Sequence, residues 1–168
     1  WSQQLKRYFH LNRSPYLPTK TIIIDLQPST AQIFAGFTSA KRRAVRRAQK
    51  NNLLIREASD ISALIKIKNK SAGFFGFITT YGIKELWHLF APRHASILLA
   101  FTPNPNPKLI GGVLLLFWDK TAYYWIVAAT RDGKKLFAPT LLVWEALQLA
   151  KKRGCRWFDF VGVWDERL

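Results

Sequence analysis

Hydrophobic and polar positions alternate along the chain in short blocks that predict an ordered series of strands and helices. Short runs rich in β-branched and aliphatic residues predict strands. Apolar residues that recur every three or four positions predict amphipathic helices between those strands. The predicted strands are 21–26, 53–57, 95–102, 109–118, 121–129 and 157–161, and the predicted helices begin near 31, 39, 60, 83 and 139.

Turn and cap signals set most of the boundaries between these elements. Pro92 ends the helix that begins near 83, because proline cannot continue a helix. Asp119 and Lys120 have the length of a tight hairpin turn, although they lack the glycine that such turns usually contain. We expect a basic turn at 131–135 and the end of the last helix at Gly154.

The predicted order is β-α-α-β-α-α-β-β-β-α-β. Three consecutive strands argue against a doubly wound parallel fold. We therefore predict an α/β fold with a mixed central sheet and helices on both sides. The 168 residues, 49% of them hydrophobic, suffice for one domain with its own core. We interpret 1–20 as a connector and 21–168 as the domain. Because methionine is absent and the sequence stops soon after an apolar, strand-like run, we expect a C-terminally incomplete piece of a longer protein.

The chain has a net charge of +16, and this charge calls for an anionic partner or another explanation. Such an excess of Lys and Arg favours phosphate-bearing partners: nucleic acid, nucleotide-linked substrates or an anionic membrane surface. A solvated basic surface is the alternative. The single cysteine, Cys155, excludes an internal disulfide and a zinc site built from cysteines. The histidines have no metal-ligand spacing, so we expect no metal.

The densest positive charge lies in 41–50, which holds six cations in ten residues. On a helix, Phe37, Ala40, Ala44 and Ala48 share one face, while Arg42, Arg43, Arg46 and Lys50 share the opposite face. Like charges at this spacing repel one another, and no acid relieves them here. We interpret the basic face as a phosphate-contacting surface, with a solvated face as the alternative.

The ordered set of segments is itself informative. It resembles the Fem-type aminoacyltransferases that build peptidoglycan cross-bridges, in particular their second, GNAT-like acyltransferase domain, over about 21–164. The resemblance rests on residues 21–26, 39–51, 111–116, 122–125, 128–130, 139–146, 150–155 and 158–162.

That resemblance implies a GNAT-like fold and transfer of an amino acid from aminoacyl-tRNA to the stem peptide of a peptidoglycan precursor. The implied partners are aminoacyl-tRNA, a lipid-linked or UDP-linked muropeptide and a companion domain of the same chain. No cofactor is implied beyond the tRNA donor. The implied location is the cytoplasm, with peripheral contact at the inner face of the plasma membrane. Where the family tends to have arginine, this chain has Lys70, which is our candidate for that phosphate contact.

Other candidate residues follow from local chemistry. Asp159 lies among aromatic residues, where a carboxyl group can act in proton transfer or simply bind backbone amides. Tyr123 is the candidate to face the reacting groups, and its neighbour Tyr124 points to the opposite face of the strand. Lys134 and Lys135 precede a helix and are expected to hold an anion there.

Two alternatives stay open. A coenzyme A-dependent N-acyltransferase of the same fold is one, although the glycine-rich loop that holds the coenzyme A diphosphate in ordinary acetyltransferases is missing at 131–135. A non-catalytic basic module that binds RNA or a membrane is the other.

Overall fold

A six-stranded sheet runs through the chain in the computed structural model, which describes residues 21–72, 81–103 and 105–162. The strand order is β1-β6-β5-β4-β3-β2. β5 and β6 are parallel, and all other neighbours are antiparallel, which confirms the predicted mixed sheet. The strands are β1 (Ile23–Asp25), β2 (Leu54–Ala58), β3 (Ala95–Phe101), β4 (Leu109–Trp118), β5 (Thr121–Ala129) and β6 (Trp157–Asp159).

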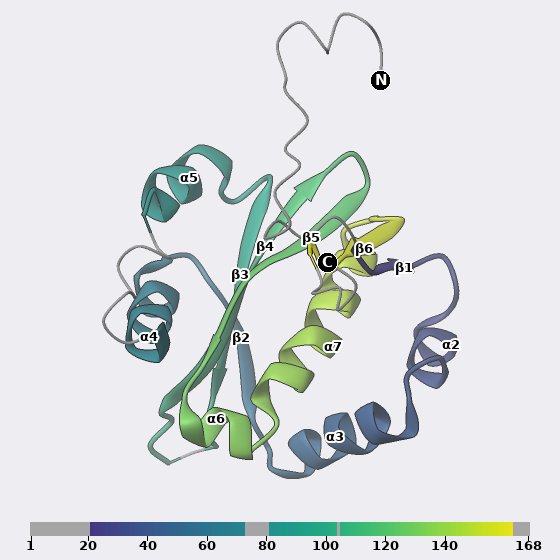
Figure 1. Cartoon of the computed structure of the whole chain (residues 1–168), viewed down its shortest axis with the longest axis horizontal. Helices are drawn as coiled ribbons and strands as arrows, with labels where there is room; N and C mark the ends of the chain where they lie inside the picture. The colour runs from purple at the N-terminus through teal and green to yellow at the C-terminus, as the bar shows by residue number, and fades with distance from the viewer. Residues whose placement is uncertain (1–20, 73–80, 104, 163–168) are drawn as a thin grey trace, which may run out of the picture.

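Helices cover both faces of this sheet, as predicted, with α2, α3 and α7 on one face and α4 and α5 on the other (Figure 1). Their bounds are α2 (Thr30–Ala35), α3 (Ser39–Lys50), α4 (Ser62–Ala72), α5 (Ile83–Phe90), α6 (Arg131–Lys135) and α7 (Ala138–Lys152). Alternation along β4 serves both layers: Val113 and Leu115 pack toward α7, and Leu114 packs toward α4. A central strand buried on both faces explains why 109–118 is almost wholly apolar.

The expected basic turn at 131–135 is wrong: this segment is the short helix α6. The Thr130 side chain caps it by accepting a hydrogen bond from the Gly133 amide at 3.0 Å. Gly133 packs so closely on β4 that a Cβ there would lie 2.1 Å from the carbonyl oxygen of Ile110. The glycine that suggested a turn is therefore required for contact between a helix and a strand.

The hairpin turn between β4 and β5 is confirmed. Asp119 and Lys120 both adopt positive φ, at 44° and 58°, which is the backbone that a two-residue hairpin turn needs. Further along, Leu115 pairs with Tyr124 and Leu114 with Ile126, which leaves an extra residue in β5. This β-bulge places Tyr124 and Val127 on the same face, the one covered by α7.

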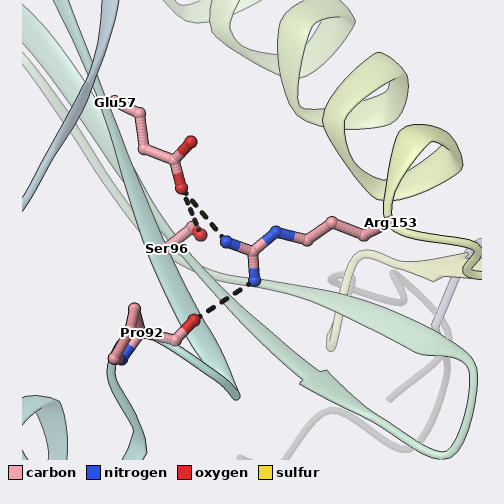
Figure 2. Close-up of polar contacts among 4 residues, drawn as sticks. All are labelled: Glu57, Pro92, Ser96 and Arg153. Atoms are coloured by element: carbon pink, nitrogen blue, oxygen red, sulfur yellow. Dashed lines mark hydrogen bonds and ion pairs between the residues drawn. The ribbon is translucent and has the colours of Figure 1, made fainter.

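Arg153 joins the C-terminal end of α7 to Glu57 on the edge strand β2 and to Pro92 before β3 (Figure 2). Its guanidinium forms an ion pair with Glu57 at 3.2 Å and donates to the Pro92 carbonyl at 3.3 Å. The same Glu57 oxygen accepts a hydrogen bond from the hydroxyl of Ser96 at 2.7 Å. The guanidinium also lies 4.5 Å from the ring centre of Phe117. These contacts set the direction of α7 across the sheet.

Candidate functional site

The parallel ladder between β5 and β6 ends early and leaves the two strands to separate. Thr121–Tyr123 pair with Trp157–Asp159, and β5 then continues to Ala129 without this partner. The predicted strand 157–161 stops at Asp159, because Val161 has a φ of 70° and breaks the extended backbone. A cavity of about 400 Å³ lies where the ladder ends, on the α7 side.

Five parts of the chain supply the walls of this cavity, which we call the β5–α7 cavity: the β1 region, the start of α3, β5, α7 and the residue that follows β6. Most of the lining side chains are aliphatic or aromatic, and none carries a carboxylate. The polar groups are two threonine hydroxyls, one phenol and one ammonium group. The lining residues are Ile22, Ile24, Phe37, Thr38, Lys41, Tyr124, Val127, Pro139, Thr140, Val143 and Phe160.

Tyr124 supplies the half-buried phenol of the cavity. Its ring lies 6.0 Å from that of Phe158 and 5.4 Å from that of Phe160. Burial raises the pKa of its phenol above the ordinary value, because the apolar surroundings disfavour the phenolate. The hydroxyl is therefore protonated at neutral pH, so it can donate a hydrogen bond but is not a base.

The electrostatic character of the cavity is positive. Lys41 lines it from α3, and its side chain is exposed. The first turns of α3 and α7 also contribute lining residues, and a helix N-terminus carries a partial positive charge. Oxygen atoms with negative or developing negative charge are therefore favoured here, and a cation is not.

The connection from β5 to α7 leaves few backbone amides for a ligand. Gly133 and Lys134 donate to Thr130, and Leu136 donates to Asp132. Phe137 donates to Lys134, and Thr140 and Leu141 donate to Phe137, while Pro139 has no amide hydrogen. The amides of a diphosphate-binding loop would have to be free, and these donate to partners inside the chain.

The basic helix α3 is rotated from its predicted orientation. Val45 and Ala48 are buried, whereas Ala40 is exposed, so the expectation that Ala40 lies on the apolar face is wrong. The larger, β-branched side chain of Val45 buries more apolar area than Ala40 would. Lys41, which the helical pattern places near the apolar face, lines the β5–α7 cavity.

The predicted phosphate-contacting residues of α3 differ in their surroundings. Arg42 is half-buried, and its guanidinium donates to the carbonyls of Ala35 and Phe37, so it helps to join α2 to α3. The other three predicted residues are exposed: Arg43, Arg46 and Lys50. Arg46 also lies 5.6 Å from the ring centre of Phe34. Phosphate binding by this face stays a prediction.

The structure brings together two lysines that the sequence singled out for separate reasons. Lys70 at the end of α4 and Lys134 in α6 line one cavity of about 450 Å³, and Arg131 joins them there. Lys135 is exposed and lies outside that lining. The residues after Lys70 that differ from the Fem-type pattern, 73–75, lie outside the described residues.

Tyr123 and Asp159 are paired neighbours on β5 and β6. Alternation places Tyr123 on the face opposite to Tyr124, so the β5–α7 cavity is lined by Tyr124 instead. The Asp159 carboxylate accepts hydrogen bonds from the Val161 amide at 2.6 Å and from the hydroxyl of Thr21. These contacts fit the interpretation of Asp159 as a group that binds the backbone.

Two further observations concern metals and membranes. Within the described ranges, no group of three or more His, Cys, Asp and Glu side chains is arranged to hold a metal ion. Within the same ranges, no helix combines the length and the hydrophobicity needed to cross a bilayer. Cys155 is half-buried, and burial raises the pKa of its thiol, with a smaller opposing effect from Arg153.

Solved structures share this fold at low sequence identity. FemX superposes with a TM-score of 0.70 and 14% identity, over 93% of this chain and 56% of the FemX chain. The C-terminal domain of a putative lysylphosphatidylglycerol synthetase from Agrobacterium fabrum gives 0.56 and 11%, over 88% of this chain and 48% of that one. L-PGS from Bacillus licheniformis superposes with a TM-score of 0.53 and 13% identity, over 83% of this chain and 45% of that one. The chain thus spans about half the length of these proteins.

The likeness to FemX confirms the predicted GNAT-like α/β fold, and it supports the Fem-type resemblance at the level of the fold. No curated protein sequence matches the chain. The family model described as the acetyltransferase (GNAT) domain matches residues 37–166, which is most of the chain. This match includes α3, the bulged strand β5 and the N-terminal turns of α7 that form the cavity. The chain therefore belongs to the GNAT acetyltransferase-domain family.

Proposed function

We propose that this domain transfers an amino acid from aminoacyl-tRNA to an amine on the stem peptide of a peptidoglycan precursor. The Fem-type resemblance implies this reaction, and the fold likeness to FemX supports it. A second neighbour is named as a putative synthetase of lysylphosphatidylglycerol, a product that carries an aminoacyl group. An acyltransferase fold and a surplus of positive charge fit a donor that is a nucleic acid.

The observation that carries the proposal is the internal hydrogen bonding of the β5–α7 connection. Coenzyme A needs donors for its diphosphate, and in this segment Thr130, Asp132, Lys134 and Phe137 already accept the amide hydrogens of their neighbours. A donor whose phosphates are held elsewhere fits better. The exposed arginines of α3 offer such contacts on the same helix whose Lys41 lines the cavity.

The proposed chemistry is the attack of an amine on an ester. The precursor amine attacks the ester carbonyl, a C–N bond forms, and the ester C–O bond breaks. The amine loses a proton, and the ribose oxygen of the tRNA takes one. An aminoacyl ester is already activated, so correct positioning supplies most of the rate. The neutral phenol of Tyr124 donates a hydrogen bond to the oxygen that gains negative charge.

The test uses the full-length protein with charged tRNA and a peptidoglycan precursor, followed by mass spectrometry of the precursor. A gain of one aminoacyl mass that disappears after ribonuclease treatment supports the proposal. A gain from acyl-coenzyme A, with none from charged tRNA, refutes it in favour of a coenzyme A enzyme. No gain from either donor, with steeply salt-dependent RNA binding, favours a basic binding module.

A matched substitution tests the role of Tyr124. Tyr124→Phe removes only the hydroxyl, and we expect kcat to fall about 100-fold, as for other single donors to a developing oxyanion. Tyr123→Phe is the control, because that hydroxyl belongs to the opposite face of β5. A larger loss from Tyr123→Phe than from Tyr124→Phe would reverse the assignment.

A further inference from the structure

The β5–α7 cavity is lined mostly by apolar side chains. Seven of its eleven lining residues have purely hydrocarbon side chains: Ile22, Ile24, Phe37, Val127, Pro139, Val143 and Phe160. No Asp or Glu is among its lining residues, and the charged group that lines it is the ammonium of Lys41. Its volume of about 400 Å³ is far larger than a methyl group requires.

Given the proposed function, we infer that this cavity receives the side chain of the aminoacyl group and selects uncharged, apolar side chains of leucine or phenylalanine size over cationic ones. The α-amino group is common to every aminoacyl ester. It therefore cancels when donors are compared, and the side chain alone decides between them.

A lysyl or arginyl side chain meets two penalties in this cavity. Its charge loses water against aliphatic walls, and no carboxylate is present to compensate. It also approaches the ammonium of Lys41, which repels it. The half-buried phenol of Tyr124 is neutral at physiological pH and provides no counter-charge.

Small side chains are disfavoured for a different reason. Hydrogen or methyl leaves most of the cavity without apolar contacts, whereas a branched or aromatic side chain removes more of the wall from water. One methylene group in a hydrophobic pocket changes kcat/KM by roughly 10-fold or more. The expected order of donors is therefore leucyl or phenylalanyl first, alanyl next and lysyl last.

The first experiment compares donors that differ only in the side chain. One tRNA is charged with leucine, alanine or lysine by an acylating ribozyme, and kcat/KM is measured with the same precursor and full-length protein. We expect leucyl-tRNA to exceed alanyl-tRNA by at least about 10-fold and lysyl-tRNA by at least about 100-fold. Equal values for the three donors, or a preference for lysine, overturn the inference.

A charge introduced into the cavity should change this order. Thr140 is the third residue of α7, where an acidic side chain is favourable for the helix, so Thr140→Asp is expected to fold. We expect the ratio of lysyl to leucyl transfer to rise at least about 10-fold, because the carboxylate compensates the ammonium. Thr140→Asn is the matched neutral control. An unchanged ratio in Thr140→Asp overturns the inference.

A binding measurement separates this inference from the proposed function. The probes are 3′-amino-3′-deoxyadenosine carrying leucine or lysine through a stable amide, and affinity is measured by calorimetry. In one outcome no tRNA donor reacts, the leucyl probe binds more tightly than the lysyl probe, and Thr140→Asp reduces this difference in affinity. The proposed reaction then fails, and the side-chain preference stands. If neither probe binds and no donor reacts, both fail.

Discussion

Among the described glycines, Gly133 is the one where an added methyl group should lower the free energy of unfolding most. A Cβ there would lie 2.1 Å from the oxygen and 3.0 Å from the carbon of the Ile110 carbonyl, and this backbone cannot rotate away as a side chain can. That carbonyl also accepts the amide of Thr130 at 2.9 Å and its hydroxyl at 3.3 Å. Relief requires α6 to move by about 1 Å, which strains both hydrogen bonds.

The magnitude follows from these contacts. Overpacking against an unyielding neighbour costs about 1–3 kcal/mol. Two weakened hydrogen bonds add about 1 kcal/mol each. We therefore expect Gly133→Ala to lower the free energy of unfolding by about 3–5 kcal/mol, a large part of the stability of an ordinary domain.

Two other glycines calibrate the measurement, which is urea unfolding followed by tryptophan fluorescence. At Gly112 the closest atoms are side-chain ends, Leu99 at 2.8 Å and Leu64 at 3.0 Å, so Gly112→Ala should cost about 1–2 kcal/mol. At Gly36 the closest atom is 3.4 Å away and the backbone is helical, so Gly36→Ala should stabilise by about 0.4–1 kcal/mol. The reasoning is refuted if Gly133→Ala costs less than Gly112→Ala.

Three further predictions concern charge. The double variant Arg43→Glu and Arg46→Glu should weaken tRNA binding steeply, measured by filter binding at about 150 mM salt, and unchanged activity there would remove α3 from the mechanism. Burial raises the pKa of Glu145, and a hydrogen bond with Gln148 opposes this effect. The protonated carboxyl group of Glu145 therefore contributes fully to stability only below about pH 4, and this contribution is lost as the pH rises. Glu145→Gln should therefore raise the melting temperature at neutral pH and leave it unchanged near pH 3, and a larger gain in acid would contradict this. In a double-mutant cycle with Glu57→Gln and Arg153→Met, the coupling should be about 0.2–1 kcal/mol and decrease with salt, because both side chains are partly exposed.

Local patterns predict most of this fold because each element depends on neighbours in sequence. The run 109–118 is apolar throughout, and the structure shows the reason, a strand buried on both faces. The two-residue length of the connection at Asp119 and Lys120 is enough to predict a hairpin turn, although the connection contains no glycine. By contrast, the sequence pattern does not predict α6, although Thr130 is a helix-capping residue. Gly133 suggests a turn, and the reason for this glycine is its contact with Ile110 of β4, which is distant in sequence.

The candidate site is less predictable because its residues meet through distant pairing. Sequence alternation places Tyr123 and Tyr124 on opposite faces, but only the packing of α7 and the end of the β5–β6 ladder decide which face holds the cavity. Similarly, the pattern of α3 predicts an apolar face through Ala40, Ala44 and Ala48, whereas the structure buries Val45 and Ala48 and exposes Ala40. The burial of Val45 against the core decides which face of the helix is buried.

The pairing of β1 with β6 joins the two ends of the described chain, with Ile24 opposite Phe158. Ile24 of β1 and Phe160, which follows β6, both line the β5–α7 cavity. Contacts so distant in sequence close late in folding, after the local meander of β3, β4 and β5. They are also the ones that open first by partial unfolding, since β1 and β6 pair over only three residues each. We expect the amide hydrogens of this edge to exchange with solvent well before those of β4, and a bound donor to slow that exchange selectively. The β5–α7 cavity is then complete only while β1 stays paired with β6.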